Sequence, residues 1–267
     1  MQQRSSRPEK WGGAVAGRRV ARHLVMRVLA CLVVSAGALV GTLAVSSAPA
    51  SATSSCPDDP GYHEYSQQYV SSGTWNGEYG NYYTYNPTVQ NISDDFSVSH
   101  LYVEYAYYSL PFVEVGWYKG VGAQHNVSTP HYYTVWGSKY SNYNENDSTD
   151  YPNLDSYRLY ELLYVGEDYN TGKAIWNFYW YTLSSPAYSV EITGLFGGQP
   201  LAGAEVASSI GDSVEAHVHG EPDFQLLDQS GSWDNWTTSI GTDTCTDSGL
   251  TLTETTKYQD FTVTGNL

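Results

Sequence analysis

Two aromatic runs, YRLYELLYV (residues 157–165) and KAIWNFYWY (residues 173–181), are joined by the short polar segment GEDYNTG (residues 166–172). Tyr, Trp, Val and Ile favour strands, and a short connection that contains glycine is typical of a β-hairpin. No stretch of useful length shows the apolar spacing of an amphipathic helix. Similar short runs, separated by Gly, Asn, Asp and Ser, recur along the chain. The sequence therefore predicts an all-β fold, an antiparallel two-sheet β-sandwich or jelly roll.

The expected strands are spread over most of the chain. The polar stretch 138–156 is expected to be a surface loop, and residues 53–80, rich in Ser, Gly and Tyr, to be partly irregular. We expect strands at residues 80–86, 96–107, 111–119, 131–137, 157–166, 173–183, 187–193, 203–209, 213–219, 223–228 and 257–264.

The first 52 residues differ in composition from the rest. Seven basic residues precede an apolar run from about Val28 to Val45, which ends in the small-residue pattern Ala50-Ser51-Ala52 or its neighbour Ala48-Pro49-Ala50. This order is typical of a secretory signal peptide. An uncleaved signal-anchor is the alternative, because the run reaches the lower limit of a membrane span. We expect residues 1–52 to be a signal peptide and residues 53–267 to be a single domain of a secreted, extracellular protein.

Charge limits the range of partners. The chain has 12 basic and 28 acidic residues, a formal net charge of −16. Without residues 1–52 it would lose seven of the basic residues and one acid, leaving five against 27, near −22. Such a charge repels nucleic acid and anionic membranes, so neither is expected as a partner. The excess of carboxylates fits a protein that works in acid, and also one kept soluble by its charge. We expect a monomer.

Two cysteines, Cys56 and Cys245, remain after the signal peptide, near the two ends of the mature chain. In an oxidising compartment they are expected to form a disulfide. A thiolate nucleophile and a cysteine-ligated metal are therefore not expected.

The segment HVHGEPDF (residues 217–224) is the candidate for metal binding. His217 and His219 share one face of an expected strand, as in the first metal motif of the cupins. That motif takes another histidine from a later segment, and no histidine follows His219. We therefore predict no metal or other cofactor. The upstream donors that a metal would need are His100, His125 or His131.

A single carboxylate interrupts the apolar run PFVEVGWYKG (residues 111–120). In a strand, alternation places the two valines and Trp117 on one face and Glu114 with Gly116 on the other. One face is therefore predicted to be core, and the other to carry an acid beside a residue that has no side chain.

Glycine also distinguishes Glu205 among the strand acids. In LAGAEVASS (residues 201–209), Glu205 shares a face with Gly203, as Glu114 does with Gly116. A missing side chain beside an acid lets a substrate backbone approach closely. Glu114 and Glu205 are therefore the predicted catalytic pair. The glutamates that fall inside expected strands are Glu104, Glu114, Glu161, Glu191, Glu205 and Glu215.

A pair of carboxyl groups within hydrogen-bonding reach can hydrolyse an amide. One group, as base, takes a proton from a water that attacks the carbonyl carbon, and the other, still protonated, protonates the leaving amine. Two carboxyl groups spaced differently around a sugar ring would instead hydrolyse a glycoside.

Aromatic residues are the second signal, with 25 tyrosines and eight tryptophans. Their rings suit sugar faces or the proline rings of an extended peptide. The candidate substrate-binding residues are Tyr133, Trp136, Trp176 and Trp180. A carbohydrate-binding, lectin-like sandwich without catalysis is thus an alternative to an enzyme.

FVEVGWYKG (residues 112–120), followed by STPHYYTVWGSKY (residues 128–140), resembles the neprosin-type glutamic peptidases. The aromatic hairpin and LAGAEV (residues 201–206) are similar to further elements of that family, over roughly residues 96–230. The resemblance implies a concanavalin-like β-sandwich, Glu114 and Glu205 as catalytic glutamates, and a secreted endopeptidase that works in acid and favours bonds near proline. The expected substrate is a polypeptide, with a polysaccharide as the alternative.

Overall fold

The structure is a computed structural model, and the residues that it describes all belong to one compact unit, Ser47–Leu267. The expected signal peptide, residues 1–52, lies outside the described residues. No helix among the described residues is both long and apolar enough to cross a membrane. The described residues are 56, 63–105, 111–138, 142–180, 183–209, 212–221, 223–237, 240, 242–256 and 259–267.

Strands make up nearly all of the regular structure of the described residues. The strands are β1 (His63–Val70), β2 (Gly77–Tyr83), β3 (Phe96–Glu104), β4 (Phe112–Gly120), β5 (Val127–Ser138), β6 (Asn142–Asp147), β7 (Tyr157–Glu167), β8 (Ala174–Trp180), β9 (Tyr188–Ile192), β10 (Gln199–Ala207), β11 (Glu215–Gly220), β12 (Gln225–Leu227), β13 (Trp233–Asn235), β14 (Thr242–Thr246), β15 (Leu250–Thr256) and β16 (Asp260–Asn266).

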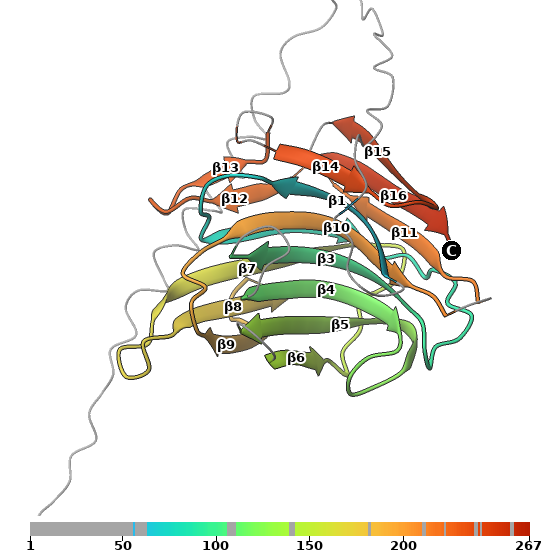
Figure 1. The fold of residues 1–267 in the computed structure, drawn as a ribbon, viewed down its shortest axis with the longest axis horizontal. Coiled ribbons are helices and arrows are strands. Elements are labelled where there is room, and N and C mark those ends of the chain that lie inside the picture. The colour runs from blue at the N-terminus through green and yellow to red at the C-terminus, as the bar shows by residue number, and fades with distance from the viewer. Residues whose placement is uncertain are drawn as a thin grey trace, which may run out of the picture. The chain divides into compact units, whose positions relative to one another are not determined.

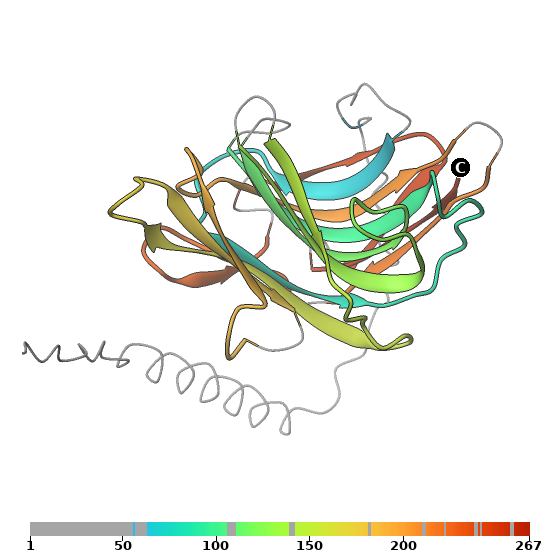
Figure 2. The same cartoon turned by 90° about the horizontal axis from the view of Figure 1, so that it is seen from below.

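These strands form two antiparallel sheets in two layers (Figures 1 and 2). The seven-stranded sheet has the order β14-β1-β10-β3-β4-β5-β6. The nine-stranded sheet has the main path β15-β16-β11-β2-β7-β8-β9, with β12 paired to β2 and β13 paired to β12. The predicted antiparallel two-sheet β-sandwich is confirmed.

The aromatic hairpin of the sequence is β7 and β8, with Leu162 opposite Phe178 in the register. Alternate residues of each strand point inward, so that Tyr160 and Leu162 are buried beside Trp176 and Phe178. The opposite positions, such as Glu161, point to the other side of the sheet. Alternation with a period of two, read from the sequence, therefore sets which face of this hairpin joins the core.

The main core lies between the two sheets. Trp117, Val113 and Val115 enter it from β4, as the sequence predicts, and all three are completely buried. Trp180 enters it from β8 and stacks on Tyr132 of β5, with ring centroids 5.4 Å apart. These contacts hold the two sheets together. Removing one large aromatic side chain from such a core lowers the free energy of unfolding by about 3–5 kcal/mol.

The structure contains several strands of polar composition that the sequence analysis did not predict. β1 lies in the stretch expected to be partly irregular, and β6 lies in the polar stretch 138–156 expected to be a loop. β14 and β15 are also strands at polar segments. Three of these are edge strands, which need only one neighbour and few apolar residues, so their sequences carry a weak strand signal.

The expected disulfide is present between Cys56 and Cys245, which are 189 residues apart in sequence. It fastens the segment before β1 to β14, and Asp247 strengthens the same junction by accepting hydrogen bonds from the backbone N–H groups of Cys56 and Tyr65, both at 2.8 Å. Closing a loop of this length stabilises the fold by about 5 kcal/mol in the chain-entropy description.

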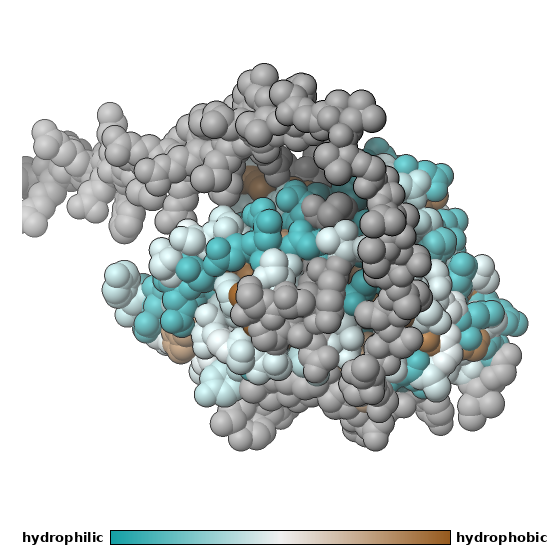
Figure 3. All heavy atoms as spheres, turned by 90° about the horizontal axis from the view of Figure 1, so that it is seen from above, coloured by the Kyte–Doolittle hydropathy of each residue, from teal (hydrophilic) through white to brown (hydrophobic). Residues whose placement is uncertain are grey.

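The surface on the side where β14 and β15 lie in Figure 1 is mostly hydrophilic, with few hydrophobic residues among those described (Figure 3). This agrees with the acidic composition of the chain.

Candidate active site

A row of three residues crosses the seven-stranded sheet. Gly203 of β10 lies opposite His100 of β3, and His100 lies opposite Gly116 of β4. Glu205 and Glu114 each stand two residues from one of these glycines, so both side chains leave the sheet on the same face as His100. We call this the outer face, because the other face of the sheet joins the core.

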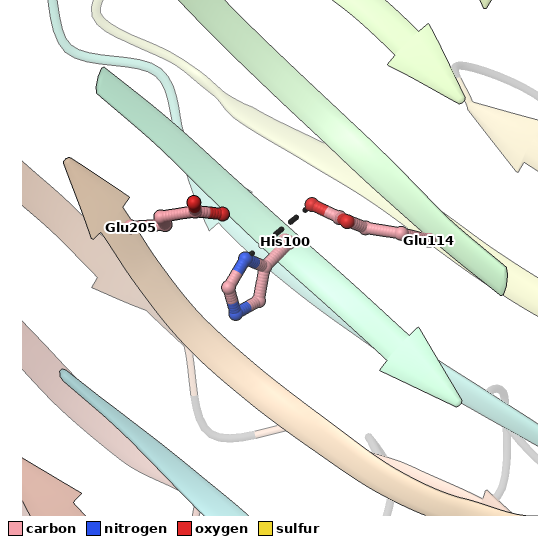
Figure 4. Close-up of side chains that lie close together, drawn as sticks. All are labelled: His100, Glu114 and Glu205. Atoms are coloured by element: carbon pink, nitrogen blue, oxygen red, sulfur yellow. Dashed lines mark ion pairs between the residues drawn. The ribbon is translucent and has the colours of Figure 1, made fainter. Parts of the chain in front are cut away.

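The side chains of His100, Glu114 and Glu205 converge on the outer face, with the imidazole near both carboxylates (Figure 4). One nitrogen or oxygen atom from each residue lies within 4.8 Å of those from the other two. The distance between His100 Nδ1 and Glu114 Oε1 is 3.5 Å. The structure thus brings together the two glutamates that the sequence analysis selected, from strands that are not adjacent in the sheet.

Glu114 is 7 % exposed and is held by a phenol. The hydroxyl of Tyr133, on the neighbouring strand β5, donates a hydrogen bond to Glu114 Oε1. Burial and the charge of Glu114 raise the pKa of Tyr133 well above its ordinary value, so its hydroxyl stays a proton donor. Tyr133 therefore satisfies one oxygen of a buried carboxyl group and fixes its orientation.

Glu205 is held by an imidazole. His63, the first residue of β1, places its Nδ1 atom 2.5 Å from Glu205 Oε1. The side chain of Glu205 is 14 % exposed and that of His63 is 36 % exposed, so this pair lies closer to solvent than Glu114 does. The two glutamates therefore have different partners and different access to water.

His100 is the site residue that the sequence analysis missed. It was named only as a possible extra ligand for His217 and His219, whereas it lies between the two glutamates and is 2 % exposed. Its Nε2 atom is 3.3 Å from Gln67 Oε1 on β1, while its Nδ1 atom has no hydrogen-bond partner among the described residues. Only the strand register places His100 beside the two glycines, and the register is not visible in the sequence.

The glycines of the row are required for a reason different from the predicted one. A side chain at Gly116 would overlap the carbonyl oxygen of Ser99, and one at Gly203 would overlap that of Ser66. The backbones of neighbouring strands, rather than a substrate, make these close approaches. The glycines therefore mark the place where the strands crowd together around His100.

Two buried residues of β2 hold this row from beneath. The hydroxyl of Tyr82 donates to the carbonyl oxygen of His100 at 2.6 Å and also interacts with the backbone N–H of Gly203. Glu78 Oε2 accepts a hydrogen bond from the backbone N–H of Tyr102 at 3.2 Å. Burial raises the pKa of Glu78 well above its ordinary value, which favours the neutral carboxyl group. Strand β3 is thus fixed at the site by polar contacts from the opposite sheet.

Apolar side chains surround Glu114 on the outer face. We call this set the outer apolar cluster, and among its contacts are the stacked rings of Tyr102 and Phe112, whose centroids are 5.0 Å apart. The cluster shields Glu114 from bulk solvent, and a hydrogen bond in such surroundings is stronger than one in water. The cluster comprises Val98, Phe112, Tyr118, Val127, Tyr133 and Val135, with Phe96 and Tyr102 packed against them.

Of the four predicted substrate-binding residues, the structure brings only Tyr133 to the glutamates. Trp176 and Trp180 lie in the core between the sheets, and Trp136 packs against the same core. Trp136 is paired with Val113 and therefore shares the inward face of its sheet. These three indoles point into the space between the sheets, whereas Glu114 and Glu205 lie on the outer face of the seven-stranded sheet. Aromatic composition alone does not tell inward rings from outward ones.

The two histidines considered for metal binding lie on the nine-stranded sheet. His219 Nε2 is 3.2 Å from Asp260 Oδ1, and His217 stacks on Tyr85 with ring centroids 3.4 Å apart. His100, His125 and His131 are on the other sheet or its loops. No metal-binding group that includes His217 or His219 is found among the described residues.

The arrangement around His100 provides the groups for hydrolysis of a carbonyl compound. Two carboxyl groups on one face can divide the tasks of base and acid, and Tyr133 keeps one of them in a fixed orientation. The imidazole of His100 adds a third polar group, with its Nδ1 atom 3.5 Å from Glu114 Oε1.

Comparison with known proteins gives distant structural likeness only. No protein-family model matches the chain, and no curated protein does. A scytalido-glutamic peptidase with a peptide-based transition state analog has a TM-score of 0.46 at 7 % sequence identity, over 76 % of this chain and 98 % of that chain. A scytalido-glutamic peptidase with a transition state analog inhibitor, and SCP-B, a member of the eqolisin family of peptidases, with the tripeptide Ala-Ile-His, each have a TM-score of 0.43 at 8 % identity and the same coverage.

Two of these structures are of scytalido-glutamic peptidases, and the third is of a member of the eqolisin family of peptidases. The resemblance to neprosin-type peptidases stays a prediction.

Proposed function

We propose that the chain is a secreted endopeptidase of glutamic type that works in acid, with Glu114 and Glu205 as its catalytic pair. The observation that carries the proposal is the meeting of these two carboxyl groups on one face, around His100, with donor atoms within 4.8 Å. Two carboxylates from non-adjacent strands are costly to bring together in a partly buried place, and such an arrangement is typical of a functional site.

The proposed reaction uses one water molecule. The reaction requires one carboxyl group of the pair to hold a proton and the other to be ionised, a condition that an acidic solution favours for two interacting carboxyl groups. The ionised group takes a proton from the water, whose oxygen forms a bond to the carbonyl carbon of the peptide. The protonated group then gives its proton to the peptide nitrogen as the carbon–nitrogen bond breaks, which leaves a carboxylic acid and an amine.

The polypeptide substrate is supported by the surroundings of Glu114. The outer apolar cluster lies beside this residue, and its two partly exposed rings, Phe96 and Tyr102, suit apolar side chains and proline rings. The negative charge of the chain supports action in acid, where self-repulsion is relieved. Secretion is supported by the disulfide between Cys56 and Cys245, because such bonds persist in oxidising compartments.

The test is cleavage of a denatured, proline-rich protein between about pH 3 and 5, in the range where a carboxyl pair retains a proton. We expect cleavage by the wild-type protein, and loss of about 10²–10⁴ in rate for Glu114→Gln and for Glu205→Gln. Glu161→Gln, which changes a similarly buried acid of the other sheet, is the matched control and is expected to cleave normally. Cleavage at the wild-type rate by both site variants would refute the assignment.

A two-carboxylate glycoside hydrolase is the second candidate function. The separation of the glutamates is compatible with the roughly 5 Å between the carboxyl groups of retaining glycosidases. The three tryptophans named as candidates for stacking on sugar or proline rings lie toward the core, which removes the main support for the lectin-like alternative. Hydrolysis of, or retention on, a polysaccharide together with no cleavage of protein would reverse this order.

A further inference from the structure

Three donor atoms of the kinds that bind transition metals converge on the outer face. They come from His100, Glu114 and Glu205, and within the part of the chain that the structure describes this is the one such group. Figure 4 shows an imidazole nitrogen turned toward the carboxylates. One imidazole and two carboxylates form a donor set that suits Zn²⁺ and the neighbouring first-row divalent ions.

Gln67 decides which imidazole nitrogen of His100 is available. A side-chain carbonyl oxygen only accepts hydrogen bonds, so the contact between Gln67 Oε1 and His100 Nε2 at 3.3 Å places the hydrogen on Nε2. In the neutral ring, the lone pair is then on Nδ1, the nitrogen that faces Glu114. Histidines that bind metals are held in the same way, with their second nitrogen donating to an oxygen.

The Nδ1 atom of His100 is buried without a hydrogen-bond partner among the described residues. Leaving a buried polar atom unsatisfied costs about 1–3 kcal/mol. In the neutral ring the lone pair of this nitrogen faces Glu114 Oε1 at 3.5 Å, and two electron-rich atoms then lie opposite each other. A cation bound between them would satisfy the nitrogen and attract both carboxylates.

We propose that His100 Nδ1, Glu114 and Glu205 bind a divalent first-row metal ion such as Zn²⁺, and that the bound ion inhibits hydrolysis. The binding follows from the donor atoms alone. The inhibition rests on the proposed function, because the ion would hold both carboxyl groups and occupy the place of the attacking water.

The distances require only a small movement. Ligand atoms lie about 2.0–2.2 Å from Zn²⁺, so two donors of a tetrahedral ion are about 3.4 Å apart. His100 Nδ1 and Glu114 Oε1 are already 3.5 Å apart. Glu205 is the more exposed carboxylate, and its donor atom, within 4.8 Å of the other two, is the one that would have to move closer. His63 contacts Glu205 Oε1 and Tyr133 donates to Glu114 Oε1, so these two residues would orient the metal ligands.

The test of binding is a calorimetric titration of chelator-treated protein with Zn²⁺ at about pH 6.5, where imidazole and carboxylate ligands bind metals. We expect one saturable site, weakened at least about tenfold in His100→Ala and in Glu205→Gln. Since His100 is buried, the partly exposed Glu205 provides a variant whose folding is less at risk. His217→Ala, which removes a histidine of the other sheet, is the control and is expected to bind as the wild type does.

The metal proposal and the peptidase proposal fail in distinguishable ways. Equal Zn²⁺ affinity of the wild type and Glu205→Gln, or loss of binding in His217→Ala, would overturn the metal site. Inhibition is measured at about pH 5, the upper end of the cleavage range, with Zn²⁺ at a concentration that a binding titration at the same pH shows to fill the site, because protons compete with the metal for its ligands. Cleavage that is stopped by this Zn²⁺ and restored by a chelator would support both parts. Cleavage that is unchanged at saturating Zn²⁺ would overturn the inhibition and leave the peptidase standing, whereas tight binding without any cleavage would support the site and refute the enzyme.

Discussion

The outer faces of the two sheets carry similar residues in different arrangements. On the seven-stranded sheet, Glu114 and Glu205 meet around His100. On the nine-stranded sheet, Glu161 is almost as buried, but the register places Tyr79 and Tyr179 on either side of it. Both faces are built from alternating strands with strand acids and tyrosines. The difference shows that the register of the strands, rather than the number of acids, creates the candidate site.

The histidines of the two faces differ in the same way. On the nine-stranded sheet, both ring nitrogens of His219 have partners, Tyr157 at 3.3 Å and Asp260 at 3.2 Å. On the seven-stranded sheet, His100 has one nitrogen bound to Gln67 and the other turned toward the carboxylates. A histidine with both nitrogens hydrogen-bonded is suited to a structural role. His100, whose Nδ1 atom has no hydrogen-bond partner in the described part of the chain and faces two acids, is suited to chemistry.

The largest effect on stability is expected at the glycines of the site. Gly116→Ala or Gly203→Ala would force a side chain into a neighbouring strand backbone, and we expect a loss of about 3 kcal/mol or more in the free energy of unfolding. Gly231, between β12 and β13 of the nine-stranded sheet, has φ +85° and open space around it, so its change to Ala is expected to cost only about 1–2 kcal/mol. Urea unfolding measures both. Equal losses at the three positions would show that the strands around His100 are not crowded.

The next largest effect is on the free energy of unfolding, which is expected to depend on pH because of the buried Glu161. Burial raises the pKa of Glu161 to about 7, above its ordinary 4.5. The unfolded chain therefore ionises first as pH rises, and the wild-type protein loses stability between these values, on the order of 3 kcal/mol. Glu161→Gln cannot ionise, so its stability is expected to fall less between about pH 4 and 8.

Unfolding of the wild type and Glu161→Gln at the two ends of that pH range measures the difference. Glu78→Gln is expected to change the pH dependence in the same direction, because burial also raises the pKa of Glu78. The same slope of stability against pH in wild type and variants would contradict the burial of neutral carboxyl groups on the nine-stranded sheet.

The smallest expected effect is a difference in kcat between two tyrosine variants, one on each sheet. Tyr133→Phe removes the hydroxyl that donates to Glu114, and we expect kcat to fall about tenfold with little change in KM, since one hydrogen bond to a charged group contributes about 1.5 kcal/mol. Tyr179→Phe makes the same change beside Glu161 and is expected to leave kcat unchanged. Steady-state rates on a peptide substrate decide between them. Equal rates for the two variants would show that the hydroxyl of Tyr133 does not contribute to catalysis.

The sequence predicted the fold class and the faces of individual strands well. Alternation assigned Trp117 to the core and Glu114 to the other face, and the spacing to Gly116 and Gly203 selected the two glutamates that meet. Alternation is a local property, so one strand is enough to reveal it.

Features that depend on several strands at once were not predicted. The place of His100 between the glutamates depends on the register of three strands, and the inward direction of Trp176 depends on which face of its sheet meets the other sheet. The polar strands β1 and β6 were missed because hydrogen bonds to a neighbouring strand, rather than apolar residues, hold them in place. Each of these is a long-range property of the chain.

The central claim is that Glu114 and Glu205 act together, and a double-variant cycle tests it most directly. The rates of peptide cleavage in acid are compared for Glu114→Gln, Glu205→Gln and the protein with both changes. If the two carboxyl groups work as one unit, each single change costs about 10²–10⁴ in rate, and the double variant is no slower than the slower single variant. Losses that multiply in the double variant would contradict the account, and so would a single variant that cleaves at the wild-type rate.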